Sequence, residues 1–466
     1  METMEKAIAK IFVFCLPLQM ITILKPVFGI FGAQAVSMCF PVHILGMMLM
    51  ICSCEGRVRI RRTKESMLLK NFGMSIILTY IVSLIMARYV FLQYGNYNGT
   101  SPFVAVTKLM LDFIQYLLII IYVGRVFKLL GKDGVLKILH STIRATLVLG
   151  YLQLGTIKGI SLCALVYNPI ATVINAVIVT STRGVSLTLM EPSHAAMFVG
   201  AIVIPFYMAK ILGGNGKKYK IELILWLPII VFSKSTTMYL LAFAAFGIAI
   251  LMSLFARRVK STIKITGVLI FIVGIFVLTN PEWIDSVTGL NFKYLLTEKL
   301  SDTGNQSTAS RMVPLVGDML IFERFPLTGC GNGLQGYFFP EVIPDSLKSG
   351  LLDVSSREML QGGGPLANGQ LFIPGIISGY GIIGMILFGA FFYKSFKSVI
   401  KNKEDYGEFY WFYIVGLLPI VVSGFKSEFI GNYYLWFALS VPLTARRNQK
   451  RELKYEDQSM LENHSL

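Results

Sequence analysis

Two groups of polar residues stand out in a chain that is otherwise mostly apolar. The first contains Arg183 and, further along, the sequence Glu191-Pro-Ser-His. Pro192 suits the first turn of a helix, whose free amides and positive dipole end would then lie beside Glu191 and His194. An arginine, an acid and an imidazole in that position can bind an anionic group and move a proton. The plainer interpretation is that Glu191 caps its own helix and pairs with Arg183. His194 would then be a residue at the membrane interface whose hydrogen bonds are all made.

The second group extends from Ser310 to Gly384 and combines Arg311 with a glycine cluster. Arg311 precedes an amphipathic segment, after which Pro326 is followed by Gly329, Gly331 and Gly333. Closely spaced glycines let the backbone bend near an anionic ligand, because they adopt conformations that other residues avoid. The same glycines are also compatible with a tight turn that binds nothing.

A lysine lies between two short apolar runs, in the sequence Ser233-Lys234-Ser235-Thr236. A charge at such a junction is costly in hydrocarbon, so Lys234 is expected to face a polar cavity rather than lipid. Other cations near the outer ends of apolar runs, such as Lys158, have an alternative role as simple interface anchors.

Composition sets the class of protein that must position these groups. Hydrophobic residues make up 54% of the chain, charged residues make up 15%, and the mean hydropathy is +0.64. Repeated apolar runs are each long enough to cross about 30 Å of hydrocarbon as a helix. An ordinary soluble domain is therefore excluded, and the alternation typical of a membrane barrel is absent. We predict an all-α, polytopic integral membrane protein with about 12 transmembrane helices in a single domain, residues 1–466.

Basic clusters predict the orientation of these helices. They alternate along the chain so that both termini, including a tail over residues 444–466, are expected in the cytoplasm. A large outer loop, residues 280–368, is expected between helices 9 and 10. The first span is predicted over Ile8–Phe28, and Ile157–Pro192 is predicted to lie along the membrane interface. The net charge of +17 then reflects the positive-inside bias and anionic membrane lipids, and nucleic-acid binding is not expected.

These motifs, in this order, resemble the superfamily of O-antigen polymerases and O-antigen ligases. The resemblance rests on Arg183 with Glu191-Pro-Ser-His, the Lys234 junction, Arg311 with Pro-Leu-Thr-Gly-Cys-Gly-Asn-Gly, and Asn368 leading into Ile-Ile-Ser-Gly-Tyr-Gly-Ile-Ile-Gly. It covers roughly residues 180 to 390 by motif. The whole chain is similar in its number of helices and in the place of its outer loop.

The resemblance implies a membrane glycosyltransferase of the GT-C-like type, acting at the outer face of a bacterial inner (cytoplasmic) membrane. A polymerase of this kind moves a growing glycan from undecaprenyl diphosphate onto another lipid-linked repeat unit, without a metal or other cofactor. The oligosaccharide on undecaprenyl diphosphate is then both donor and acceptor, and a chain-length regulator and a flippase are possible partners. The implied catalytic residues are Arg183, Glu191, His194 and Arg311. The implied substrate-binding residues are Arg183, Lys234, Arg311, Gly329, Gly331, Asn332 and Asn368.

One departure from the superfamily favours a polymerase over a ligase. Ligases typically carry histidine just before the asparagine that opens the helix after the large loop, and Ala367 stands there in this chain. Candidates for the base that accepts the proton of the acceptor hydroxyl are Glu191, His194, Asp318 and Glu323, with Glu191 preferred. A ligase and a lipid-linked oligosaccharide flippase are the alternative functions. A flippase is expected to place its cations along a central cavity rather than at one face.

Overall fold

The computed structural model describes a helical protein. The described residues are 1–19, 21, 24, 37–53, 64–96, 101–174, 184–189, 191–214, 216–255, 306–345, 371–425 and 432–444, and all their regular secondary structure is helical. The predicted all-α class is therefore confirmed for this part of the chain. Arg183, Asn368, the predicted ninth span and much of the predicted outer loop lie outside the described residues.

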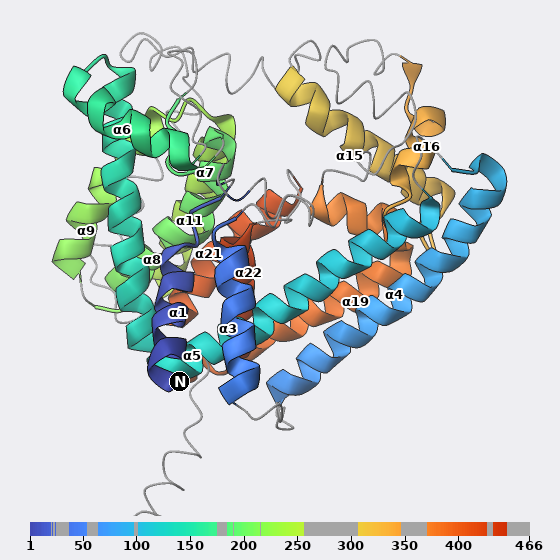
Figure 1. Cartoon of the computed structure of the whole chain (residues 1–466), viewed down its shortest axis with the longest axis horizontal. Coiled ribbons are helices and arrows are strands. Elements are labelled where there is room, and N and C mark those ends of the chain that lie inside the picture. Colours follow the sequence, from blue (N-terminus) through green and yellow to red (C-terminus); the bar gives the residue numbers. More distant parts are fainter. Residues whose placement is uncertain are drawn as a thin grey trace, which may run out of the picture.

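Figure 1 shows the helices in chain order; α7, η4 and α8 run on as one continuous helix. Their bounds are α1 Glu2–Phe14, α3 Cys39–Ser53, α4 Lys64–Tyr94, α5 Pro102–Ile157, α6 Ser161–Ile174, α7 Pro192–Phe198, the π-helix η4 Val199–Val203, α8 Ile204–Leu212, α9 Gly216–Leu225, α10 Leu227–Val231, α11 Thr236–Phe255, α15 Gln306–Arg324, α16 Gln335–Val342, α19 Phe372–Lys401, α20 Lys403–Tyr406, α21 Glu408–Gly424 and α22 Tyr433–Thr444.

Five helices among the described residues are long and apolar enough to cross a membrane. They are Ser66–Tyr94, Pro102–Ile157, Pro192–Leu212, Thr236–Leu254 and Phe372–Lys401. Three shorter apolar helices, Cys39–Ser53, Ser161–Val173 and Glu408–Gly424, accompany them. These helices are those of a membrane-embedded protein, whereas the total of about 12 spans stays a prediction.

Helix α5 changes direction at Gly131, where φ is 67° and ψ is 170°. The chain therefore forms two arms that meet in a V (Figure 1). At 1.5 Å per residue, each arm is long enough to cross about 30 Å of hydrocarbon. By hydropathy alone, this stretch would be two spans, one about Val104–Gly124 and one ending near Thr156, joined by a basic loop. In the structure, helix continues on both sides of Gly131. The basic residues of that stretch therefore lie on helical turns rather than in a loop.

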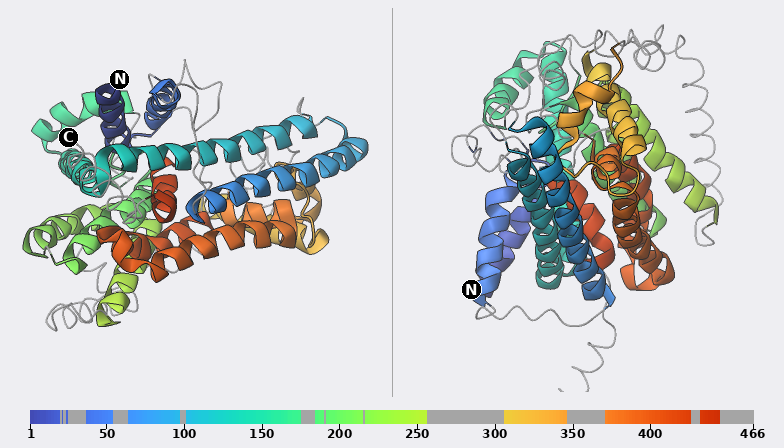
Figure 2. Two further views of the ribbon diagram at one scale, coloured as in Figure 1. Left: turned by 90° about the horizontal axis from the view of Figure 1, so that it is seen from below. Right: turned by 90° about the vertical axis from the view of Figure 1, so that its right-hand side faces the viewer.

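The helices pack around an aromatic core. Figure 2 shows α4, the first arm of α5 and α19 running side by side, in agreement with their mutual contacts. Tyr116 on α5 stacks on Trp436 of α22 with ring centroids 4.0 Å apart, and Phe72 on α4 stacks on Phe391 of α19 at 4.5 Å. These contacts tie helices far apart in sequence into one bundle.

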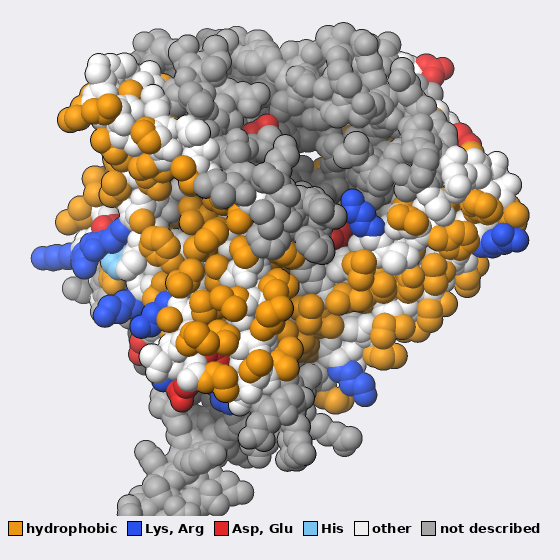
Figure 3. Space-filling view, in the orientation of Figure 1, with side chains coloured by type: hydrophobic (Ala, Val, Ile, Leu, Met, Phe, Trp, Pro, Cys, Tyr) orange, Lys and Arg blue, Asp and Glu red, His pale blue; other side chains and the backbone are white. Residues whose placement is uncertain are grey.

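The outer faces of the bundle are strongly apolar. Ile77, Ile81 and Ile85 lie on one face of α4 and expose 52%, 50% and 66% of their surface. Figure 3 shows hydrophobic side chains spread over the faces of α3, α4 and α5. Such a continuous apolar surface is expected where helices face lipid.

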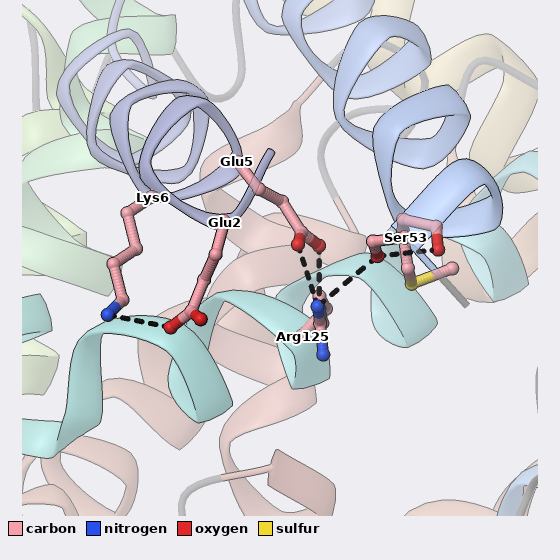
Figure 4. A network of polar contacts seen from close by, with 6 residues as sticks. Glu2, Glu5, Lys6, Ser53 and Arg125 are labelled. Carbon is pink, nitrogen blue, oxygen red and sulfur yellow. Dashed lines mark hydrogen bonds and ion pairs between the residues drawn. The ribbon is translucent and has the colours of Figure 1, made fainter. Parts of the chain in front are cut away.

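Buried and half-buried ion pairs tie the helices together at one end of the bundle. Arg125 of α5 donates to both carboxylate oxygens of Glu5 on α1, at 2.6 and 2.7 Å, and also contacts Ser53 of α3 (Figure 4). Glu5 is fully buried. Lys210 of α8 likewise pairs with Glu408 of α21. The basic residues at this end therefore hold helices together as well as contributing to the net positive charge of the chain.

Two predicted segments differ from the structure. The run Ile8–Phe28 was expected to be one helix, but α1 ends at Phe14 and turns through Cys15 before Pro17, because a proline disfavours helix at the residue before it. Of the stretch expected along the interface, α6 exposes apolar side chains, whereas residues 184–189 are buried inside the bundle. Average hydropathy cannot separate a segment that lies on the bilayer from one inserted into the protein.

Candidate functional site

A short non-helical segment, residues 184–189, is inserted between the helices and is here called the strap. Its side chains from Val185 to Leu189 are each at most 1% exposed. Irregular backbone at this depth must find its hydrogen bonds within the protein. Non-helical backbone among membrane helices is typical of places that bind a substrate or ion.

The strap contacts the junction that carries Lys234. The backbone N–H of Val185 donates to the carbonyl of Phe232 at 3.1 Å. A Cβ atom on Gly184 would lie 1.9 Å from the carbonyl oxygen of Ser233, so only glycine permits this approach. Gly184 directly follows Arg183, which is itself outside the described residues. The structure therefore brings the neighbour of Arg183 against the neighbour of Lys234.

Among the described residues, backbone strain at non-glycine positions falls on the two segments that meet here. Within the described part of the chain, only Leu187 and Lys234 have positive φ without being glycine, at 59° and 50°. A non-glycine residue in this region costs about 1–3 kcal/mol and persists only where the surroundings enforce it. One of the two lies on the strap and the other on the junction that the strap contacts. Such strain is concentrated at functional sites more often than elsewhere.

The positive charge at this junction is not limited to Lys234. Lys158 follows the end of α5 and is exposed, and its ammonium group lies 4.5 Å from the ring centroid of Phe232. Phe232 is also the residue whose carbonyl binds the strap. Both lysines are therefore close to the turn between α10 and α11, as an anion-binding site requires.

Glu191 and His194 lie at the start of the helix formed by α7, η4 and α8. Glu191 occupies the N-cap position in an extended conformation, but its side chain makes no capping hydrogen bond. Its carboxylate accepts instead from the Ser193 hydroxyl at 3.3 Å. The His194 carbonyl accepts from the Tyr434 hydroxyl at 3.3 Å. The predicted helix start at Pro192 is confirmed, whereas the simple capping role of the Glu191 side chain is wrong.

A series of polar contacts connects the strap to this helix start. Thr188 of the strap donates to the Pro17 carbonyl at 2.7 Å, and Gln19 donates to the Asn432 side chain at 2.9 Å. Asn432 immediately precedes α22, which carries Tyr434. The ends of α1, α7, α11 and α22 thus meet around the strap. Sequence motifs did not signal Gln19 or Asn432, because isolated amides in apolar runs have no distinctive spacing.

The second predicted group forms a loop, Pro326–Leu334, that packs into a break in α19. Gly329, Gly331 and Gly333 have φ of 66°, 91° and 97°, which confirms the predicted bend. The N–H of Cys330 donates to the Ser378 carbonyl and that of Gly331 to the Gly379 carbonyl, each at 2.9 Å.

Gly381 interrupts α19 with φ of 59° and ψ of −155°. Beyond it, the N–H groups of Ile382 and Ile383 donate to the carbonyls of Pro326 and Leu327, at 2.8 and 3.2 Å. The loop thus satisfies backbone groups that the break leaves free. Gly329 packs against the backbone of Gly379 and Tyr380 in α19, and Gly331 lies beside Ser83 and Met86 of α4, so their described contacts are with the protein itself, as in the plainer interpretation. Ligand binding by these glycines stays a prediction.

A buried polar network joins this loop to α15 and α16. The Asn332 side chain donates to the Tyr380 hydroxyl at 2.8 Å and accepts from Gln335 at 3.2 Å. Ser378 donates to one carboxylate oxygen of Asp318 at 2.6 Å, and the other oxygen has no hydrogen-bond partner. Complete burial raises the pKa of Asp318 to about 7, against a smaller opposing effect of the Ser378 hydrogen bond.

The remaining predicted residues are placed only in part. Arg311 lies within α15, and its side chain is outside the described set; Glu323 is an exposed residue of the same helix. Within the described ranges, no group of three or more His, Cys, Asp or Glu residues is arranged to hold a metal ion. No protein-family model, curated protein or solved structure matches the chain.

Proposed function

We propose that this protein is a polysaccharide polymerase that transfers a growing glycan from a lipid diphosphate onto another lipid-linked repeat unit at the outer face of a bacterial inner membrane. The proposal is supported above all by the contact between the strap and the turn at Phe232 and Ser233. This contact relates the segments of Arg183 and Lys234, which the resemblance assigns to the diphosphate.

The proposed reaction explains why cations are needed there. An oxygen of the acceptor sugar attacks the anomeric carbon of the donor, and the bond from that carbon to the diphosphate breaks with its electron pair on the diphosphate. Negative charge therefore increases on the leaving group, where Arg183 and Lys234 stabilise it. Arginine binds phosphate with two parallel hydrogen bonds, while lysine acts as a point charge.

The proton of the acceptor hydroxyl needs a base. Glu191 is our candidate because its carboxylate does not cap α7 and the residue is only partly buried. It lies at the N-terminus of α7, which begins beside the strap. In the proposed reaction the hydroxyl proton passes to Glu191 as the new glycosidic bond forms, and is then released to water.

An apolar groove on the membrane helices fits a lipid-linked substrate. It has a volume of about 270 Å³ and is lined by side chains of α19, α21 and α22 that carry no charge. Phe388 and Ile420 are buried at its floor, and Met385 and Val421 are exposed at its mouth. In the proposal, this groove holds part of the hydrocarbon chain. The chain enters the groove from bilayer hydrocarbon rather than from water, so van der Waals packing holds it there.

The test uses the purified full-length protein in detergent with a synthetic lipid-diphosphate repeat unit. We expect a ladder of lengthened glycans that survives addition of a chelator and is lost in Arg183→Ala and Arg311→Ala. Lys218→Ala, on a different helix, is the matched control and should retain the ladder. Unchanged substrate in detergent, together with movement of that substrate across proteoliposome membranes, would replace the polymerase with a transporter.

A further inference from the structure

The strap is held by one side chain of α5 whose role no sequence motif indicated. We propose that Gln153 is a positioning residue, which keeps the strap in its strained conformation and thereby sets its contact with the turn that carries Lys234 and the place of Glu191 beyond it. This inference rests on the proposed function, because positioning is defined relative to the diphosphate leaving group.

The Gln153 side chain makes three hydrogen bonds to the strap and is 1% exposed. Its oxygen accepts from the N–H groups of Ser186 and Leu187, at 3.0 and 2.8 Å. Its nitrogen donates to the Ser186 hydroxyl at 3.0 Å. In a buried segment without helix or strand partners, these bonds satisfy backbone groups that would otherwise be unpaired.

The bonds act at the strained residue itself. Leu187 has φ of 59°, and its N–H is one of the two held by Gln153. One turn earlier on the same face of α5, a Cβ atom on Gly150 would lie 2.8 Å from the Leu187 side chain. Gly150 therefore makes room for the side chain that Gln153 orients. The two α5 residues together select this conformation of the strap.

Two further hydrogen bonds of the strap lie before and after, along the chain, the two residues that Gln153 binds. Val185 binds the Phe232 carbonyl, and Thr188 binds the Pro17 carbonyl. If the middle of the strap relaxes, the residues beyond both contacts move with it. Misplacement of a charged group by about 1 Å costs a reaction roughly 100-fold in rate. The loss should appear in kcat more than in KM, because charge on the leaving group builds up only in the transition state.

The decisive variants are Gln153→Met, Gln153→Glu and the control Gln115→Met. Methionine has a similar length and removes all three bonds. A glutamate buried to this extent is expected to be protonated, so its carbonyl oxygen still accepts from both N–H groups and its hydroxyl donates to Ser186. Gln115 lies on the other arm of α5 and donates to the Tyr433 hydroxyl at 3.0 Å. Its substitution removes a half-buried amide on the same helix and leaves the strap's bonds intact.

Three readouts are measured: amide hydrogen exchange at Ser186 and Leu187, the melting temperature, and kcat and KM for glycan lengthening. We expect Gln153→Met to exchange faster at both amides and to lose about 10- to 100-fold in kcat with little change in KM. Gln153→Glu should recover kcat to within about threefold of wild type, and Gln115→Met should leave kcat and strap exchange unchanged.

The inference is wrong if Gln153→Met exchanges faster but keeps its kcat, or if Gln115→Met loses kcat to the same extent. A fall in melting temperature with parallel losses of kcat in all three variants would reduce Gln153 to a purely structural residue. If wild type makes no lengthened product, the proposed function fails and positioning fails with it. The exchange result then decides separately whether Gln153 holds the strap.

Discussion

The buried carboxyl of Asp318 predicts that the contact between α15 and α19 weakens as pH rises. The folded protein keeps the Asp318 proton up to a pKa of about 7, because burial disfavours the charged form, whereas the ordinary value is 3.8. Between these values the folded state binds more protons than the unfolded state, so stability falls as pH rises and then levels off. The Cys330 thiol, whose pKa burial raises well above its ordinary value, lies beside this carboxyl and stays neutral over the range.

Asp318→Asn removes the titrating group while keeping an acceptor for Ser378. The wild-type protein should lose about 3 kcal/mol of local stability between pH 5 and pH 8, whereas the variant should lose none. The added amide hydrogens lack an obvious acceptor and cost about 1–3 kcal/mol at every pH. The two proteins should therefore be similar at pH 5, and the variant should be more stable by about 1–3 kcal/mol at pH 8.

The assay is hydrogen exchange at the amides of Cys330 and Gly331, corrected for intrinsic rates, because both amides bind α19 carbonyls beside Ser378. The ratio of wild-type to variant opening constants should rise about 100-fold between pH 5 and pH 8. Glu323→Gln makes the same chemical change at an exposed position of α15 and should have no effect. Equal pH dependence in wild type and Asp318→Asn would refute the reasoning.

Three further predictions concern packing. Arg125→Ala leaves the buried Glu5 carboxylate unpaired and should lower stability by about 3–5 kcal/mol; thermal unfolding in detergent should show it, and an unchanged melting temperature would contradict it. Gly381→Ala forces a side chain into positive φ, with its Cβ 2.6 Å from the Gly329 nitrogen, and should increase proteolysis of the loop that packs into α19. A Cβ atom on Gly389 would meet no atom within 4 Å, so Gly389→Leu should fold normally while its side chain fills the mouth of the groove. Its KM for a long-chain lipid substrate should rise relative to that for a short-chain analogue, and equal changes for both would argue against the groove.

Much of the helical framework follows from apolar runs in the sequence. The apolar run Thr237–Phe255 forms α11, Thr236–Phe255, and the apolar run Phe409–Val422 lies within α21, Glu408–Gly424. These segments are recognisable because a spanning helix must satisfy its backbone internally and present apolar side chains along its length.

The interruptions could not be predicted from apolar runs. The break at Gly381 lies inside one such run, and its free backbone groups are satisfied by the distant loop at Pro326. The strap likewise depends on Gln153, a single amide whose partners are known only once the chain is folded. The Gly-Tyr-Gly sequence before Ile382 is the one local signal that could have indicated the break.

The sequence predicted individual residues of the candidate site but not how they are arranged in space. The sequence indicated Glu191, His194 and Lys234 from their charge and their places beside apolar runs. It could not show that the Lys234 turn is strained or that it contacts Gly184. These features arise from tertiary packing, which overrides local preference at sites where the backbone is held in a costly conformation.

The central claim is that Arg183 and Lys234 act together on one leaving group, and a double-mutant cycle tests it most directly. Glycan lengthening would be measured for wild type, Arg183→Ala, Lys234→Asn and the double variant; asparagine is chosen because it tolerates positive φ. The effects of substituting two groups that act on the same charge are not additive. The double variant should therefore be only slightly less active than the less active of the two single variants. Losses that multiply in full would show that the two cations act independently and would contradict the proposed site.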